Sequence, residues 1–119
     1  MSVAFQGRNL IIDGKTIEMP HSIIDAAEVG ERIYVLFDPN AFIKDPKYKD
    51  IFAPGAPSIR NLVAVTKEGS ILWEAEFPQP SDYYYNFSSV EPLLVNSFSS
   101  YRCEIDPSDG KIVRKVFFK

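Results

Sequence analysis

The sequence predicts an all-β fold, an antiparallel meander of about nine strands in consecutive hairpins within one domain, residues 1–119. Short runs of residues alternate between apolar and polar side chains, which is the period of a strand with one buried face. Turn-forming residues separate these runs, and connections this short join antiparallel rather than parallel strands. Nine prolines argue against long helices, and an aromatic content of 13% is typical of β structure.

The clearest hairpin occupies residues 60–77. Residues 62–65 are apolar at every position, which predicts a central strand covered on both faces. A polar turn containing Gly69, where a positive φ is expected, leads into the second strand. Alternation in that strand predicts one buried face, made of Ile71, Trp73, Ala75 and Phe77.

Two further hairpins precede it. The pair Asp13-Gly14 within residues 9–19 is one of the strongest short hairpin signals. Residues 22–29 fit either a turn of helix or a strand, and both alternatives stay open at this stage. The strand alternative is favoured because residues 32–37 are β-branched and aromatic and follow after a single tight turn.

The remaining chain contains one long irregular connection, about residues 39–59, which is rich in proline and charge. Further strands are predicted at residues 83–87, 93–98, 101–105 and 111–118. We expect these hairpins to form an open twisted sheet or a sandwich.

A repeat links two of the hairpins. Gly69 and Gly110 each follow a strand and a polar turn, precede an apolar run, and lie 110 − 69 = 41 residues apart. Periods of about 40 to 45 residues are those of four-stranded propeller blades. Over about half of the chain, these segments resemble the repeat core of quinoprotein and WD-type β-propellers. The resemblance implies blade-like sheets, and it implies no cofactor because no residue that holds a quinone or metal in that larger family is matched.

Charge and composition narrow the range of functions. The formal net charge of −3 disfavours nucleic-acid binding and suits a basic protein partner. The first residues lack the pattern of a signal peptide, and no apolar run approaches the length of a membrane span. The single cysteine, Cys103, cannot form an internal disulfide, which favours a reducing compartment. We therefore predict a cytoplasmic protein without membrane contact.

The residues that could carry catalysis or bind a metal do not form a recognisable set. His21 is the only histidine and has no nucleophile at a recognisable spacing. Cys103 lies in a predicted strand, where a buried apolar role is expected. Residues 106–110 are similar to part of a calcium loop, but residues 111–119 supply no carboxylate side chain. We predict no enzyme activity, no cofactor and no metal.

Residues 83–87 contain four aromatic side chains in five positions. In a regular strand Tyr83, Tyr85 and Phe87 share one face while Tyr84 points away, so some rings are either exposed or line a pocket. Tyrosine-rich patches suit protein contacts, and core packing is the alternative. The predicted partner-binding residues are Phe42, Tyr48, Phe52, Asp82, Tyr83, Tyr84, Tyr85 and Glu91.

Two functions remain open. The first is a protein-binding module, acting as a monomer or an edge-paired dimer, that neutralises a basic bacterial toxin by covering its active site. Its size, acidity and missing catalytic set give the chain the general character of small bacterial immunity proteins. The second is a small-ligand-binding or hydrolase-like domain with a pocket at the mouth of the sheet, using His21, Tyr34 or Asp82.

Overall fold

A computed structural model of the chain describes residues 3–43, 59–79 and 82–118. Within these residues it contains eleven strands and one short helix, which confirms the all-β prediction. The elements are β1 (Val3–Gln6), β2 (Asn9–Ile12), β3 (Lys15–Glu18), β4 (Ile23–Val29), β5 (Arg32–Phe37), α1 (Pro39–Ile43), β6 (Leu62–Val65), β7 (Ile71–Glu74), β8 (Tyr84–Val90), β9 (Leu93–Ser97), β10 (Tyr101–Ile105) and β11 (Ile112–Phe117).

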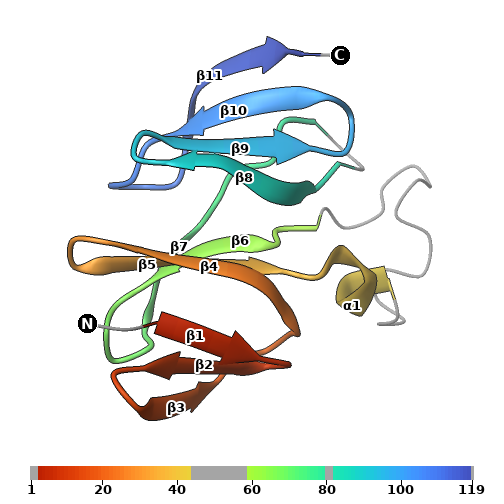
Figure 1. Ribbon diagram of the computed structural model, residues 1–119. Coiled ribbons are helices and arrows are strands. Elements are labelled where there is room, and N and C mark those ends of the chain that lie inside the picture. The colour runs from red at the N-terminus through yellow and green to blue at the C-terminus, as the bar shows by residue number, and fades with distance from the viewer. Residues whose placement is uncertain (1–2, 44–58, 80–81, 119) are drawn as a thin grey trace.

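The strands form three antiparallel sheets, each a meander of consecutive strands. Sheet A has the order β1-β2-β3, sheet B the order β4-β5-β6-β7, and sheet C the order β11-β10-β9-β8. Figure 1 shows the sheets stacked as layers, with sheet B between the other two. The predicted antiparallel hairpins are confirmed, and residues 22–29 contain strand β4 rather than a turn of helix.

The predicted count of about nine strands was too low. Strand β1 has only Val3 and Phe5 as alternating large apolar residues, a signal too short to stand out. Strand β8 continues to Val90, although the sequence Ser88-Ser89 favours a turn. Pairing with β9 overrides that local preference: the register shifts at two irregularities in β8, and the strand stays paired as far as Val90.

Sheet B is covered on both faces, as the apolar run at residues 62–65 predicted. From β5 and β6, Val35 and Val63 face the core between sheets A and B. Leu36 and Leu62, their neighbours in the chain, face the core between sheets B and C. Every residue of β6 is buried. Such strands read as continuous apolar runs because both of their faces are removed from water.

The two outer faces of the stack are mainly polar. On sheet A the register places Gln6, Asn9 and Glu18 on the outer face, and all three are exposed. On sheet C the side chain of Asn96 donates to Oδ1 of Asn86 at 2.8 Å and accepts from Nε of Arg102 at 3.1 Å, which forms a polar ladder across three strands. Polar outer faces allow the stack of three sheets to end in water.

The 41-residue repeat has a physical cause. Gly69 and Gly110 occupy equivalent turns, between β6 and β7 and between β10 and β11, and both have positive φ. A Cβ at Gly69 would lie 2.7 Å from Cδ1 of Ile17 in sheet A, and one at Gly110 would lie 2.5 Å from Cε3 of Trp73 in sheet B. Each glycine therefore lets one sheet approach the previous one closely.

The predicted buried face of β7 is only partly correct. Trp73 and Ala75 are buried between sheets B and C, but Ile71 is 50% exposed. The register shifts where Val65 pairs with Ile71 and Ala64 pairs with Trp73, so an extra residue separates the two pairs. An inserted residue of this kind moves the side chains on its two sides to opposite faces.

A buried asparagine connects sheet B to sheet C. The side-chain Nδ2 of Asn61 donates to the carbonyl oxygens of Phe37 at 2.9 Å and Tyr84 at 2.6 Å. Its Oδ1 accepts from the backbone N–H of Tyr84 at 3.1 Å. Asn61 is fully buried, so these bonds satisfy backbone groups that water cannot reach and set the position where β8 begins.

Candidate functional site

Three of the predicted partner-binding residues are buried. Phe42 lies on α1 in the core between sheets A and B, with its ring stacked on His21 at 4.1 Å between centroids. Tyr84 lies in the core between sheets B and C, and its hydroxyl donates to the carbonyl of Glu76 at 2.5 Å. Asp82 is also fully buried. Tyr48 and Phe52 lie outside the described residues.

Asp82 fixes a turn of sheet C. Its Oδ1 accepts from the backbone N–H groups of Tyr83 at 2.8 Å and Ser99 at 3.1 Å. These bonds hold the turn between β9 and β10 against the beginning of β8. Its other oxygen, Oδ2, has no hydrogen-bond partner among the described residues. Asp82 therefore positions the aromatic residues around it, and the geometry gives it a supporting role.

Tyr83 and Tyr85 lie in an aromatic surface at one end of sheet C. Tyr83 stacks on Phe98 at 5.1 Å between centroids, and Tyr101 meets Phe117 edge to face at 5.6 Å. Pairing of Tyr101 with Phe117 brings these segments together. We call this surface the aromatic end of sheet C; it consists of Tyr83, Tyr85, Phe98, Tyr101, Phe117 and Phe118.

The predicted alternation of residues 83–87 holds for Tyr84 and Tyr85 and fails at Phe87. Tyr84 and Phe87 both pack against the core between sheets B and C, while Tyr85 is 41% exposed. The register of β8 shifts between Tyr84 and Asn86, so two residues that are three positions apart face the same way.

Strand β11 forms an edge of sheet C next to the aromatic end. Its side chains Val113, Val116 and Phe117 are 62%, 48% and 60% exposed. The backbone N–H of Phe118 donates to the carbonyl of Ser100, so in this ladder the backbone groups of Phe117 and Lys115 point away from β10. Among the described residues no strand pairs with that side of β11. We call this unpaired side the β11 edge.

The segment that follows β7 contacts the beginning of the β11 edge. The carboxylate of Glu76 accepts from the backbone N–H of Ile112 at 2.9 Å, and the N–H of Glu76 donates to the carbonyl of Gly110 at 2.9 Å. The side chain of Lys115 donates to the carbonyl of Pro78 at 2.9 Å. Beyond Ile112, no backbone hydrogen bond to this side of β11 is found among the described residues.

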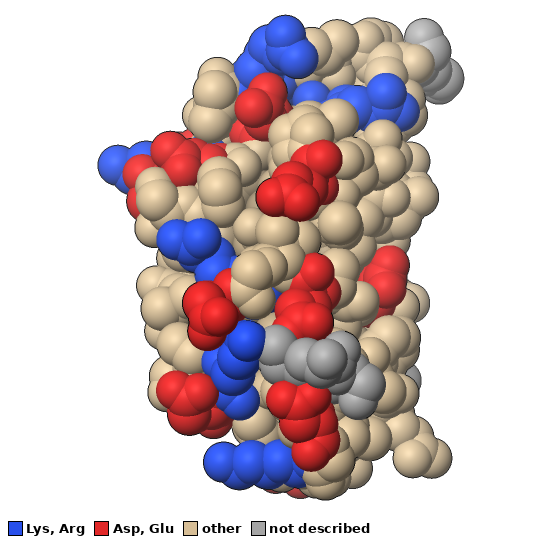
Figure 2. Space-filling model, turned by 60° about the vertical axis from the view of Figure 1, so that its left-hand side comes forward, with Lys and Arg blue, Asp and Glu red and all other residues tan. Residues whose placement is uncertain are grey.

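Basic side chains gather around β11 although the chain is acidic overall, and the carboxylates of Glu76 and Glu104 lie among them. Lys111, Arg114 and Lys115 lie in or beside β11, and Arg102 lies on the neighbouring strand. The Lys115 ammonium sits 4.7 Å above the centre of the Tyr101 ring. Figure 2 shows basic side chains at the top of the molecule, over sheet C, and interspersed charges below.

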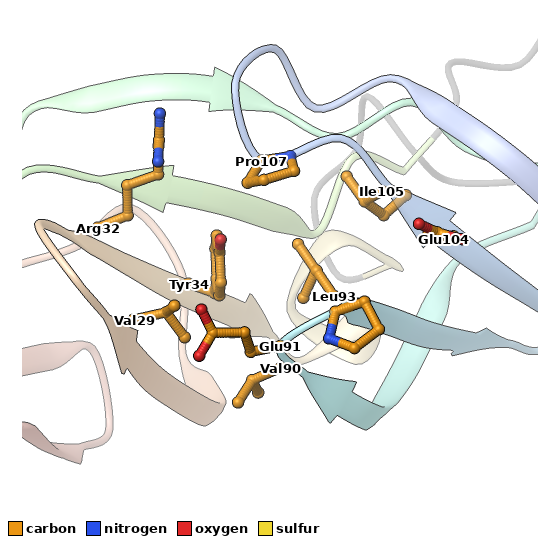
Figure 3. A pocket seen from close by; sticks show the side chains of 10 residues that line it. Val29, Arg32, Tyr34, Val90, Glu91, Leu93, Glu104, Ile105 and Pro107 are labelled. Atoms are coloured by element: carbon orange, nitrogen blue, oxygen red, sulfur yellow. The ribbon is translucent and has the colours of Figure 1, made fainter.

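A pocket lies at the opposite end of sheet C, between sheets B and C. It encloses about 250 Å³ and lies among the turns between β4 and β5, β8 and β9, and β10 and β11. In Figure 3, Tyr34 and Glu91 lie on one side of it together with Val29 and Val90, and Glu104 lies on the other side beside Ile105. Its lining residues are Val29, Val90, Pro92, Leu93, Ile105 and Pro107, with Arg32, Tyr34, Glu91 and Glu104.

Tyr34 is an ionisable group of this pocket. Burial raises the pKa of its hydroxyl; Arg32 lowers that pKa and Glu91 raises it. Both charges therefore act on the same hydroxyl, which stays protonated at neutral pH. The sequence predicted three residues for a ligand pocket. Tyr34 lines the pocket between sheets B and C, whereas His21 and Asp82 do not. Glu91, predicted as a partner-binding residue, also lies here, away from Tyr83 and Tyr85.

The sequence could have revealed more of these surfaces. Residues 112–118 carry apolar side chains at both odd and even positions, so a strand here has apolar side chains on both faces. Because this is the last strand of the meander, it forms an edge where these side chains are not all covered. The role of Arg32 depends on sheets B and C lying against each other, and no local pattern indicates it.

Cys103 is fully buried in β10, as predicted. Burial raises the pKa of its thiol to about 11, despite a hydrogen bond with Tyr84 that lowers it. The folded protein therefore holds this proton more tightly than the unfolded chain does. Its contribution to stability is constant below the ordinary pKa of 9.0 and falls as the pH rises toward 11.

The thiol of Cys103 is expected to be almost unreactive at pH 8, because the thiolate is the nucleophile and is scarce. A colorimetric thiol reagent should label the native protein slowly and the protein in guanidinium chloride at once. Rapid labelling of the native protein would contradict the buried position.

No group of three or more metal-binding side chains is found in the described parts of the chain. Helix α1 is five residues long, and no helix in the described ranges is long and apolar enough to cross a membrane. No curated protein matches the sequence. A family model described as a domain of unknown function, DUF7957, matches residues 1–117, and the chain therefore belongs to that family.

Proposed function

We propose that the protein is a non-enzymatic binding module that takes an extended, acidic segment of another protein along the β11 edge. The observation that carries the proposal is an unpaired edge strand with exposed apolar side chains and positive charge. A peptide that adds a strand to a sheet edge gains main-chain hydrogen bonds, and its side chains supply specificity.

The aromatic end enlarges this surface. Phe98 and Phe117 are 57% and 60% exposed, and they are the kind of side chain that anchors protein interfaces. The stacking of Tyr83 on Phe98 holds the exposed ring in place before any partner arrives. Less conformational freedom is then lost on binding.

Charge favours a different protein over a second copy of this chain. In a dimer paired through two β11 edges, Arg114 and Lys115 of one copy would lie close to the same residues of the other. Like charges placed opposite each other across paired strands are destabilising. An acidic segment instead meets Lys111, Arg114 and Lys115 with opposite charge, and it competes with Glu104 for Arg114.

A displayed library of random peptides, selected against the full chain, tests the proposal. We expect enrichment of peptides that alternate apolar with acidic residues. The variant Arg114→Glu should weaken binding of the enriched peptides by about fivefold or more, because an attraction becomes a repulsion. The salt dependence of binding should fall in the same variant.

The matched control is Lys15→Glu, which reverses an exposed basic residue on sheet A, far from β11. It should bind the enriched peptides as the original chain does. Enrichment of basic peptides, equal losses in both variants, or a dimer that buries β11 in place of peptide binding would each contradict the proposal.

A finer proposal from the sequence is an immunity protein that covers the active site of a basic toxin. The net charge of −3 supports it. It requires an acidic surface, and the β11 edge is basic, so the partner would bind elsewhere on the chain. Binding of a basic toxin domain that survives Arg114→Glu would favour this alternative.

A further inference from the structure

We infer that the pocket between sheets B and C binds a small zwitterion with an apolar body, of the class of the apolar α-amino acids. This site is separate from the β11 edge, because the turns that form it lie at the other end of sheet C. It therefore goes beyond the proposed function, and either one can fail without the other.

The polar groups of Arg32, Tyr34 and Glu91 lie on one side of the pocket. In Figure 3 the Tyr34 hydroxyl lies between Arg32 and Glu91, and Leu93, Ile105 and Pro107 lie across the pocket from them. The effect of both Arg32 and Glu91 on the Tyr34 hydroxyl agrees with this placement. The hydroxyl is thus presented with a carboxylate on one side and a guanidinium on the other, and apolar side chains lie across the pocket.

The charges of the lining residues indicate a dipolar ligand. Glu104 already pairs with Arg114 at 3.9 Å. The other ion pairs found among the described residues join Arg8 to Glu18 and Lys67 to Glu31. Arg32 and Glu91 take part in none of these, although Arg32 lies near enough to Asp106 to lower the pKa of that carboxyl. A ligand carboxylate would therefore share Arg32 with Asp106, and Glu91 is available to a ligand cation.

The chemistry of each group suits one end of an amino acid. The guanidinium of Arg32 can bind a carboxylate through two parallel hydrogen bonds, and the carboxylate of Glu91 accepts from an ammonium. The protonated hydroxyl of Tyr34 can donate a hydrogen bond to the ligand carboxylate or accept one from the ligand ammonium. The apolar side chains favour a branched or aromatic body, whose contact with them removes water from both surfaces.

Titration of the full chain with four small molecules, followed by backbone amide NMR shifts, tests the inference. The probes are L-leucine, 3-methylbutylamine with the cation alone, 4-methylpentanoate with the anion alone, and glycine with both charges and no apolar body. We expect leucine to shift the amides of Tyr34, Leu93 and Ile105. Each other probe should bind roughly tenfold more weakly or worse, because one charge-assisted contact or the apolar contact is lost.

Two variants test which pocket residue binds which charged group of the ligand. Glu91→Gln should weaken leucine binding roughly tenfold and leave 4-methylpentanoate unchanged, and Arg32→Gln should weaken both. Glu68→Gln, an exposed carboxylate in the turn between β6 and β7, is the control and should change neither. Thermal unfolding of all three variants should match the original chain, which separates lost binding from lost fold.

Three results would overturn the inference. One is the absence of shifts at the pocket residues up to about 10 mM leucine, a concentration that covers very weak sites. The second is an amine or an acid that binds as tightly as leucine, since the pocket would then recognise a single charge. The third is leucine binding that both pocket variants retain.

Discussion

Replacing Tyr84 with alanine is expected to lower the free energy of unfolding by about 4 kcal/mol, a large part of the stability of a domain this size. Its ring is 2% exposed and packs between sheets B and C. Removal leaves a cavity among side chains that cannot all relax. The hydroxyl bond to the Glu76 carbonyl is lost as well.

The neighbouring residue supplies the control. Tyr85 is 41% exposed, so Tyr85→Ala should change the free energy of unfolding by no more than about 0.5 kcal/mol. Tyr84→Phe isolates the hydroxyl and should cost about 1 kcal/mol. Urea denaturation followed by Trp73 fluorescence measures all three. Equal stability of the two alanine variants would contradict the burial of Tyr84 and the exposure of Tyr85.

Replacing Gly110 with alanine is expected to cost about 3 kcal/mol, from two sources. At φ +79° an L side chain is strained, which costs roughly 1–2 kcal/mol. The added Cβ would also lie 2.5 Å from Cε3 of Trp73, so the ring or the turn has to move. Overpacking of this kind costs roughly 1–3 kcal/mol.

The variant Gly14→Ala distinguishes backbone strain from overpacking as causes of the lost stability in Gly110→Ala. Its φ of +82° is nearly the same, but nothing lies within 4 Å of the place its Cβ would take. Gly14→Ala should therefore cost only the backbone strain, about 1–2 kcal/mol. The difference between the two melting temperatures reports the close approach of sheet C to sheet B. If both variants melted at the same temperature, Gly110 would not lie against Trp73.

Local sequence patterns predicted most of the fold because the sheets are built from hairpins, in which neighbouring segments of the sequence pair with each other. The turn at Asp13-Gly14 formed as predicted, with positive φ at both residues. Residues 62–65 became a strand buried on both faces. In each case the chemistry of a few neighbouring residues decided the outcome.

The errors share a different cause. Bulges reversed the expected faces of Ile71 and Phe87, and a bulge depends on the partner strand as much as on the strand itself. The grouping of the candidate residues depended on how the sheets stack. Strand β8 separates Tyr85 near its beginning from Glu91 just after its end, and the stacking of sheets A and B buried Phe42 in another layer.

Both proposed sites depend on sheet C lying against sheet B through Gly110 and Trp73, and a proton NMR spectrum tests that contact most directly. The α-hydrogen of Gly110 that takes the place of a Cβ should point at the Trp73 ring, whose indole N–H donates to the Pro107 carbonyl at 2.9 Å. The account predicts a strong nuclear Overhauser effect between this hydrogen and the ring, together with an upfield shift of its resonance. A Gly110 α-hydrogen at an ordinary chemical shift, with no cross-peak to Trp73, would contradict it.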